Sequence, residues 1–222
     1  FEKLVAVATS RDADLQGSPA RDAEARLREA AAAGAEALLR EHEAAWAELW
    51  RTADINVRQA DGSEELTQGL TYALYQMLAN APRGGAGVQI GAKGLTGEHY
   101  FGTYFWDTEA FMLPMFVFVL PAVARDLVRF RIRTLDAARA KAAEMGLAGA
   151  AYPFMADADG RESCTLWQFA LLGVHVTADV AWGVWLYVCA TGDLDILAEG
   201  GIDVMVETAR FWVSRASPRG AD

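Results

Sequence analysis

Apolar and polar residues alternate along most of this chain with the period of an α-helix. From Ser18-Pro19 onward, the larger apolar residues recur at roughly 3.6-residue spacing between glutamates and arginines. Serine is a favoured helix cap, and proline suits the first helical position. We therefore predict one long helix from here to about Arg51, and we interpret it as a connection between two domains.

Further helices are predicted over most of the remaining chain. One begins at residues 63–65 and ends before Pro82. Four more complete the pattern, over residues 108–122, 125–145, 165–190 and 195–215. Gly146 and Gly192 follow two of these helices, at positions typical of C-caps.

The predicted helices differ in how their apolar residues are distributed. Residues 110–124 and 166–188 are apolar on nearly all sides, whereas residues 125–145 are amphipathic. In a double ring of helices the inner ones are wrapped by the outer ones and lose their polar face. The pattern therefore fits an all-α toroid, although a two-layer helical stack would look similar.

Residues 4–9 are the exception, because their valines and alanines favour a short strand. One strand cannot bury itself without neighbours, and the nearby chain supplies none. We interpret this segment as the end of a β domain outside the sequence, and a frayed terminus is the alternative. The first residues lack the basic start and apolar core of a signal peptide.

Composition and net charge limit the classes of partner that the chain is expected to bind. The chain has 222 residues and is 53% hydrophobic, which is enough for a sizeable core. Its 30 acidic against 20 basic residues give a net charge of −10, which argues against nucleic acid as a partner. The uncharged run at residues 110–124 is shorter than the ~20 residues that cross a bilayer, so no membrane segment is predicted.

Cysteines and histidines give no sign of a metal site. Cys164 and Cys189 are far apart and lack the spacing of a zinc site or a disulfide framework, so we predict a reducing, cytoplasmic setting. The three histidines also lack metal-ligand spacing. No metal or other cofactor is therefore predicted.

Residues 91–114 form the segment that looks most like a site, a glycine-rich loop followed by Trp106-Asp107 and an apolar helix. Nucleotide-binding patterns fail in the loop between Pro82 and Gly102, because Gly85 and Gly87 lack the third glycine and Lys93 has no Ser or Thr after it. An indole beside a carboxylate instead suits a sugar ring, which stacks its C–H face and donates hydroxyl hydrogen bonds. The alternative is a core tryptophan followed by a helix cap.

Three other features of the sequence each have a functional and a structural interpretation. Asp107 and Glu109 are two residues apart on a helix and so do not face each other as an acid–base pair, which leaves Glu109 to stabilise the helix N-terminus. His175 and Asp179 share one helix face and point either at a partner or at a cavity, or His175 is a hydrogen-bonded core residue. Trp182 and Trp185, three residues apart, are interpreted as core residues, although carbohydrate sites also use such aromatic side chains.

Two stretches, residues 90–100 and residues 105–114, closely resemble the signature of glycoside hydrolase family 65. This family includes maltose, trehalose and kojibiose phosphorylases and acid trehalases. The resemblance implies the first part of an (α/α)6 barrel, preceded by linker helices and a remnant strand of an N-terminal β-sandwich. It divides the chain into residues 1–17 from the sandwich, 18–62 as linker and 63–222 as an incomplete catalytic barrel.

The resemblance also implies a function, inverting phosphorolysis of an α-glucosidic disaccharide with inorganic phosphate as co-substrate and no cofactor. Trp106 and Asp107 would line the glucosyl site, and Phe154, Glu162 and His175 are further candidates for contact with substrate. The full-length protein would be a homodimer. A hydrolase of the same family, similar to acid trehalase, is one alternative, and a catalytically dead fragment for sugar binding or assembly is another.

The sequence departs from the family pattern at three places. Residues 102–104 read Gly-Thr-Tyr where many members have Gly-His, and residues 152–155 read Tyr-Pro-Phe-Met where many have Tyr-Pro-Trp-Glu. The family's general-acid glutamate lies in an Asp-Glu-Tyr-His-type segment, which is expected downstream of Asp222. The chain by itself is therefore predicted to be inactive.

Overall fold

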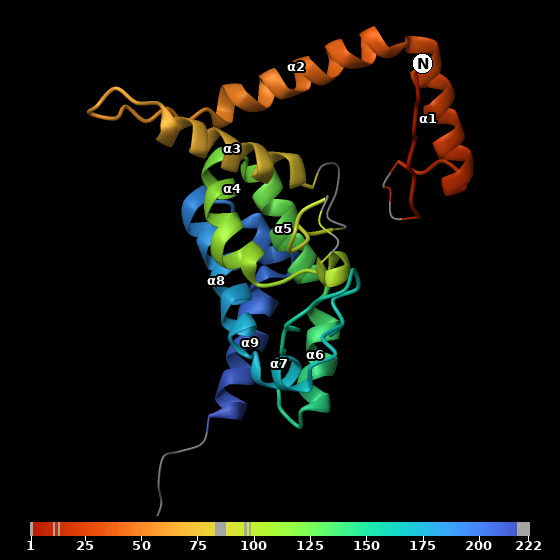
Figure 1. The fold of residues 1–222 in the computed structure, drawn as a ribbon. Coiled ribbons are helices and arrows are strands. Elements are labelled where there is room, and N and C mark those ends of the chain that lie inside the picture. Colours follow the sequence, from red (N-terminus) through yellow and green to blue (C-terminus); the bar gives the residue numbers. More distant parts are fainter. Residues whose placement is uncertain are drawn as a thin grey trace, which may run out of the picture. The chain divides into compact units, whose positions relative to one another are not determined.

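The helices of this chain fall into two units, residues 1–71 and 72–222, each of which is described by itself (Figure 1). The computed structural model describes residues 2–10, 12, 14–82, 88–95, 97 and 99–216. Helices are the main regular elements of the described chain, which contains isolated bridges but no extended strand, so the prediction of an all-α fold is confirmed.

Unit 1 begins with a non-helical segment and continues with two helices. Residues 2–9 form neither a helix nor a strand in the described structure, so the short strand predicted for residues 4–9 is not observed. A strand is not stable without a neighbour to pair with, and the described chain offers none here. Arg26 ties this segment to the first helix, because its guanidinium donates to the Val7 carbonyl oxygen at 3.3 Å and lies 3.2 Å from the Asp12 carboxylate.

The single long helix predicted for residues 19–51 is wrong, because two helices occupy this stretch. They are α1 (Pro19–Ala33) and α2 (Ala35–Ala53). Gly34 separates them with φ 80° and ψ 159°, a conformation open to glycine and incompatible with a continuing helix. The predicted start is correct, since the Ser18 hydroxyl accepts a hydrogen bond from the Arg21 amide.

Helix α3 (Glu65–Asn80) carries the boundary between the units and confirms the helix predicted before Pro82. Unit 2 continues with short turns and further helices. They are η1 (His99–Gly102), the π-helical turn η2 (Thr108–Met112), α4 (Leu113–Val119), α5 (Pro121–Arg133), α6 (Leu135–Glu144), α7 (Trp167–Leu172), α8 (His175–Thr191), the π-helical turn η3 (Leu197–Gly201) and α9 (Ile202–Arg215).

Several predicted helices are divided more finely than the apolar pattern indicates. Pro121 begins α5 directly after Leu120, whose φ of −140° ends α4. Thr134 separates α5 from α6, and its hydroxyl donates back to the Phe130 carbonyl oxygen at 2.9 Å. Gly173 ends α7, so residues 165–190 form two helices. Periodicity alone does not mark such breaks, because apolar residues continue on both sides.

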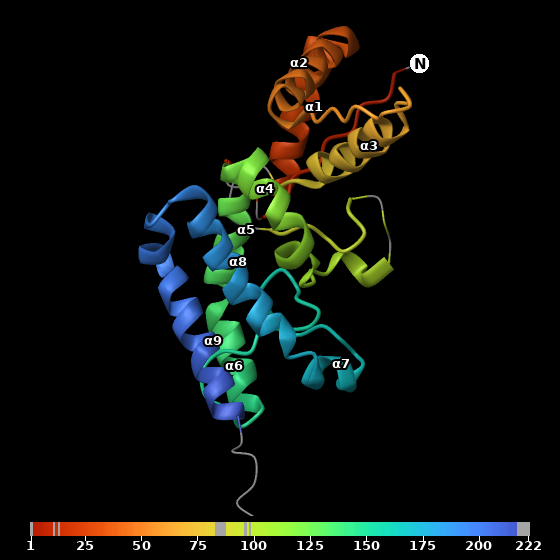
Figure 2. The same ribbon diagram turned by 90° about the vertical axis from the view of Figure 1, so that its left-hand side faces the viewer.

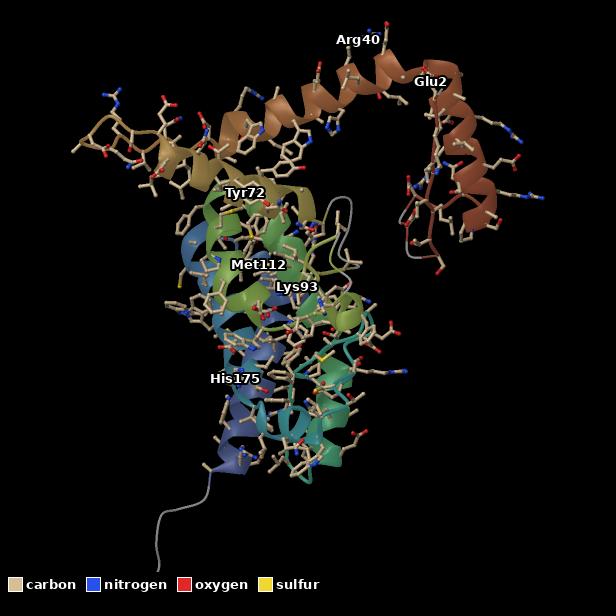
Figure 3. All side chains as sticks on the ribbon, in the orientation of Figure 1. Glu2, Arg40, Tyr72, Lys93, Met112 and His175 are labelled. Atoms are coloured by element: carbon tan, nitrogen blue, oxygen red, sulfur yellow. The ribbon has the colours of Figure 1, made fainter. Side chains whose placement is uncertain are left out.

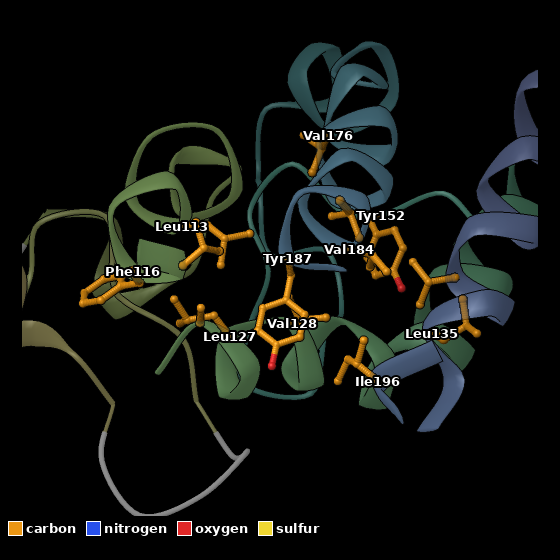
Figure 4. Close-up of a cluster of buried hydrophobic side chains, with 14 of the residues drawn as sticks. Leu113, Phe116, Leu127, Val128, Leu135, Tyr152, Val176, Val184, Tyr187 and Ile196 are labelled. Carbon is orange, nitrogen blue, oxygen red and sulfur yellow. The ribbon is translucent and has the colours of Figure 1, made fainter. Parts of the chain in front are cut away.

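The core of unit 2 lies where α4, α5 and α8 meet, and Figure 4 shows their side chains pointing toward one another. Phe116, Leu127 and Val184 are each 1% exposed or less. Helix α9 packs on α8 and α6, which extends the bundle along one side (Figure 2). This packing places the start of η2 and the start of α8 in the same helical unit.

Trp182 and Trp185 were expected in the core, and that expectation is wrong for the described structure. Their side chains are 39% and 51% exposed, on a helix that is apolar on nearly all sides. A uniformly apolar helix gives no polar face from which sequence could choose the exposed side.

Candidate functional site

The Trp106-Asp107 pair lies between an extended segment and the start of a helix. Tyr104 and Ala156 form an antiparallel bridge, with backbone hydrogen bonds of 2.9 and 2.8 Å. The chain then turns into η2, and the Trp106 carbonyl oxygen accepts from the Ala110 amide at 2.9 Å. Both ends of the pair are thus anchored by backbone hydrogen bonds.

Aromatic side chains from three segments surround Trp106. The His175 ring meets the Trp106 ring edge-on with centroids 5.1 Å apart, and the Phe111 ring lies at 5.4 Å. Phe154 contacts the ring of His175 at 6.2 Å and that of Phe105 at 5.6 Å. The structure therefore brings Trp106, Phe154 and His175 together although they lie far apart in the sequence. Figure 3 shows His175 at the start of α8, below Met112 of η2.

Asp107 stands at the start of η2, and its carboxylate makes no capping hydrogen bond there. It also makes no hydrogen bond or ion pair with any other residue that the structure describes. The side chain is half-buried beside the half-buried Trp106. A carboxylate without a protein partner keeps its acceptor capacity for a ligand.

Glu162 lies in the same region, but its carboxylate is engaged by the protein. Oε2 accepts from the Lys141 ammonium at 2.6 Å and from the Phe154 amide at 2.8 Å. Oε1 accepts from the amides of Met155 and Cys164 at 3.0 and 3.1 Å. Glu162 therefore fixes the loop that carries Phe154. Its predicted contact with substrate stays a prediction.

A buried charged network lies beneath the Trp106-Asp107 pair. The Arg131 guanidinium donates to both oxygens of Glu109, at 2.7 and 2.9 Å, and the Gln89 amide donates to the same carboxylate at 2.9 Å. Arg131 and Glu109 are 2% and 3% exposed. Glu109 does lie in the first turn of a helix, as predicted, but its carboxylate serves this ion pair.

Helix α8 faces this network with one stripe of residues. His175 contacts Trp106, and Gly183, two turns later, lies so close to Glu109 that an added Cβ would be 3.2 Å from its Cγ. Asp179 lies between them on the same face, and burial raises the pKa of its carboxyl group. His175 and Asp179 therefore point at the segment around Trp106, one of the two possibilities left open by the sequence.

Sequence reasoning missed the partner of Glu109. A signal was present, because Arg131 is four residues from both Leu127 and Leu135 and so falls on the apolar face of the helix predicted over residues 125–145. The left-handed backbone of Tyr100 and Phe101, with φ of 63° and 54°, gives no comparable signal in the sequence. Such strain often accompanies functional loops.

The described residues give no positive sign of a metal site or of a membrane-spanning helix. Within the described ranges, no group of three or more His, Cys, Asp or Glu side chains could hold a metal ion. The described helices include none that is both long enough and apolar enough to cross a bilayer. Cys164 and Cys189 are free thiols, and the cytoplasmic setting stays a prediction.

Comparison with known proteins identifies relatives of both units. Residues 71–221 match the model of the glycosyl hydrolase family 65 central catalytic domain, and residues 1–49 match that of the family 65 N-terminal domain. Among curated proteins, a kojibiose phosphorylase of Caldanaerobacter subterraneus is 42% identical over 179 residues, and a maltose phosphorylase of Bacillus subtilis is 38% identical over 169 residues.

These alignments cover 76% of this chain but only 23% and 22% of the two relatives, so the chain spans less than a quarter of their length. Among solved structures, a human-microbiome protein named as a kojibiose phosphorylase superposes with a TM-score of 0.81 at 31% identity. That superposition covers 90% of this chain and 26% of the other. The fold is therefore that of a fragment of the family's (α/α) barrel.

Proposed function

Because the chain belongs to glycosyl hydrolase family 65, we propose that it is part of an inverting phosphorylase that acts on an α-glucosidic disaccharide. The observation that carries this proposal is the half-buried Trp106 beside the carboxylate of Asp107, which pairs with none of the described side chains or backbone groups. This is the combination that a glucosyl ring requires, an aromatic face for its C–H groups and an acceptor for its hydroxyls.

Each candidate residue has a distinct proposed role. Asp107 accepts hydrogen bonds from two hydroxyls of the non-reducing glucosyl unit, and Trp106 packs against its ring. His175 meets Trp106 edge-on and limits its rotation, and Phe154 extends the aromatic wall. Glu162 serves the site by holding the Phe154 loop through three backbone amides.

The proposed reaction is phosphorolysis with inversion. Inorganic phosphate attacks C1 of the glucosyl unit from the face opposite the glycosidic oxygen, and the C1–O bond breaks. A glutamic acid protonates the departing oxygen, which leaves as a hydroxyl of the acceptor sugar. Phosphate is already anionic, so one protein carboxyl group suffices.

We propose that this glutamic acid lies outside residues 1–222. Glu109 does not suit the task, because it is buried and paired with Arg131. Among the described residues of η2, no second unpaired carboxylate faces Asp107. The 222-residue chain alone is accordingly expected to show no turnover, and the full-length protein is proposed to act as a homodimer.

The test is phosphate dependence in the full-length protein. Maltose, trehalose and kojibiose are supplied separately, with and without inorganic phosphate, and glucose 1-phosphate and free glucose are measured. We expect glucose 1-phosphate from one of these disaccharides, and no reaction without phosphate. Equal rates of glucose release without phosphate would show a hydrolase instead. Turnover by the isolated 222-residue chain would refute the proposed absence of the acid.

The division into residues 1–17, 18–62 and 63–222 is also a proposal. The compact units meet between residues 71 and 72, and the N-terminal family model ends at residue 49. Limited proteolysis of the full-length protein tests it, with cleavage expected near residues 54–62, between α2 and α3. Resistance there, with cleavage inside α2, would contradict the division.

A further inference from the structure

Arg131 holds both ends of the short segment that carries Trp106 and Asp107. Its Nη2 donates to the Phe105 carbonyl oxygen at 3.3 Å, and Nε and Nη2 donate to the Glu109 carboxylate at 2.7 and 2.9 Å. Trp106 and Asp107 lie between these two anchor points. One planar guanidinium therefore fixes the start and the end of the turn.

The same arginine also supports the segment that leads to Phe154. The Tyr152 hydroxyl donates to the Arg131 carbonyl oxygen at 2.7 Å, and the Tyr152 amide donates to the Thr177 hydroxyl at 3.1 Å. Phe154 follows two residues later and contacts Phe105 at 5.6 Å. The segments before and after Trp106 and the segment before Phe154 therefore meet at one residue of α5.

Stability alone would not require a charged pair at this place. Apolar side chains of similar size often stabilise a buried position as well as an ion pair does. The guanidinium differs because its donors are fixed in one plane and bind a carboxylate at two points while still reaching a carbonyl oxygen. Its particular contribution is geometric.

We propose that Arg131 and Glu109 are positioning residues of the glucosyl site, which set Trp106 and Asp107 in the arrangement that binds the sugar. This inference rests on the proposed function. Misplacement of a binding group by ~1 Å can lower a rate by ~100-fold. We call the contacts of Arg131 with Glu109 and with the Phe105 carbonyl oxygen the clamp. Its loss should therefore raise the KM of the glucoside.

Two variants of the full-length protein separate positioning from stability. R131K keeps the positive charge but cannot bind Glu109 and the Phe105 carbonyl oxygen with one rigid fork. E109L/R131M replaces the pair with apolar side chains and so leaves no unpaired buried charge. E199Q is the matched control, because Glu199 also forms a two-point ion pair with an arginine of α5, Arg129, at 2.7 and 3.0 Å.

Three quantities are measured for each variant, the KM of the disaccharide, the inhibition constant of glucose, and amide hydrogen exchange over residues 105–112. We expect R131K and E109L/R131M to raise KM and the glucose inhibition constant by ~10-fold or more and to speed exchange, with E199Q within about twofold of wild type. Folding is checked by the melting temperature, which a merely structural pair would change without changing KM.

The outcomes are separable. A folded E109L/R131M protein with wild-type KM and wild-type exchange would overturn the proposal, and so would faster exchange with unchanged KM. If the wild-type protein turns over no α-glucoside, the proposed function fails, and exchange over residues 105–112 then decides the clamp alone. In that case, unchanged amide exchange over residues 105–112 in R131K would also overturn the proposed positioning role of Arg131 and Glu109.

Discussion

Glu162 offers a sharp test of how the Phe154 loop is held. Its carboxylate accepts four hydrogen bonds, from the Lys141 ammonium and from the amides of Phe154, Met155 and Cys164. In E162Q the side chain keeps one acceptor oxygen and turns an NH2 group toward two donors. Whichever way the amide is oriented, two of the four hydrogen bonds are lost.

The magnitude follows from the number of bonds and their exposure. A hydrogen bond to a charged group contributes about 1.5–3 kcal/mol, so the loss of two gives ~3–6 kcal/mol in a dry site. Glu162 and Lys141 are 18% and 12% exposed, so water replaces part of this loss. We expect about 2–4 kcal/mol, which corresponds to roughly 30- to 900-fold faster opening of the loop.

Amide hydrogen exchange at Phe154, Met155 and Cys164 measures this opening directly. K141M is the matched variant, because it removes one donor and leaves the three amides bonded to the carboxylate. D136N is the control, since that side chain is 91% exposed and its pair contributes little. If E162Q and K141M speed exchange equally, the carboxylate acts through its ion pair and the reasoning about the backbone amides is refuted.

Three further predictions concern the rest of unit 2. G149A should lower the free energy of unfolding by about 2–4 kcal/mol, because the φ of Gly149 is 78° and an added Cβ would lie 2.2 Å from the Glu207 carbonyl oxygen. G146A is the control and should lower it by only ~1–2 kcal/mol, because Gly146 has a φ of 71° but open space around it. Equal losses in denaturant titrations would contradict this reasoning. D179N should stabilise the protein at neutral pH, because burial raises the pKa of Asp179 and the folded state therefore disfavours its charged form. The gain in stability over the wild type should shrink as the pH falls through that raised pKa, where Asp179 becomes neutral. A difference in melting temperature that does not depend on pH would refute this prediction. D107N should raise the KM of the glucoside by roughly 10-fold or more with little change in melting temperature, because the carboxylate has no partner to lose among the residues that the structure describes. A lower melting temperature with unchanged KM would mark Asp107 as structural.

The helical character of this chain could be predicted because it is a local property. Ser18 and Pro19 mark the start of α1, and the residues before Pro82 form α3 as the pattern indicates. The breaks at Gly34, Thr134 and Gly173 were missed, since apolar periodicity continues across them and only backbone conformation records the interruption.

The roles of the candidate site residues stay predictions, and the structure shows which of these residues lie together. Trp106, Phe154 and His175 were chosen largely from a resemblance, and the structure brings their rings together. The partner of Glu109 was missed, because pairing it with Arg131 depends on how η2 packs against α5.

The sequence by itself determined the helical fold class, the family resemblance and the Trp106-Asp107 pair, because periodicity, capping residues and motifs are written in neighbouring residues. Only the tertiary structure decided which carboxylates are free. Asp107 has no hydrogen-bond or ion-pair partner among the residues that the structure describes. Glu109 pairs with Arg131 and Glu162 pairs with Lys141, two residues from distant parts of the chain, and Glu162 also accepts from nearby backbone amides. The physical reason is that the availability of a charged group depends on the donors that packing brings to it, and those donors lie as many as 22 residues away along the chain.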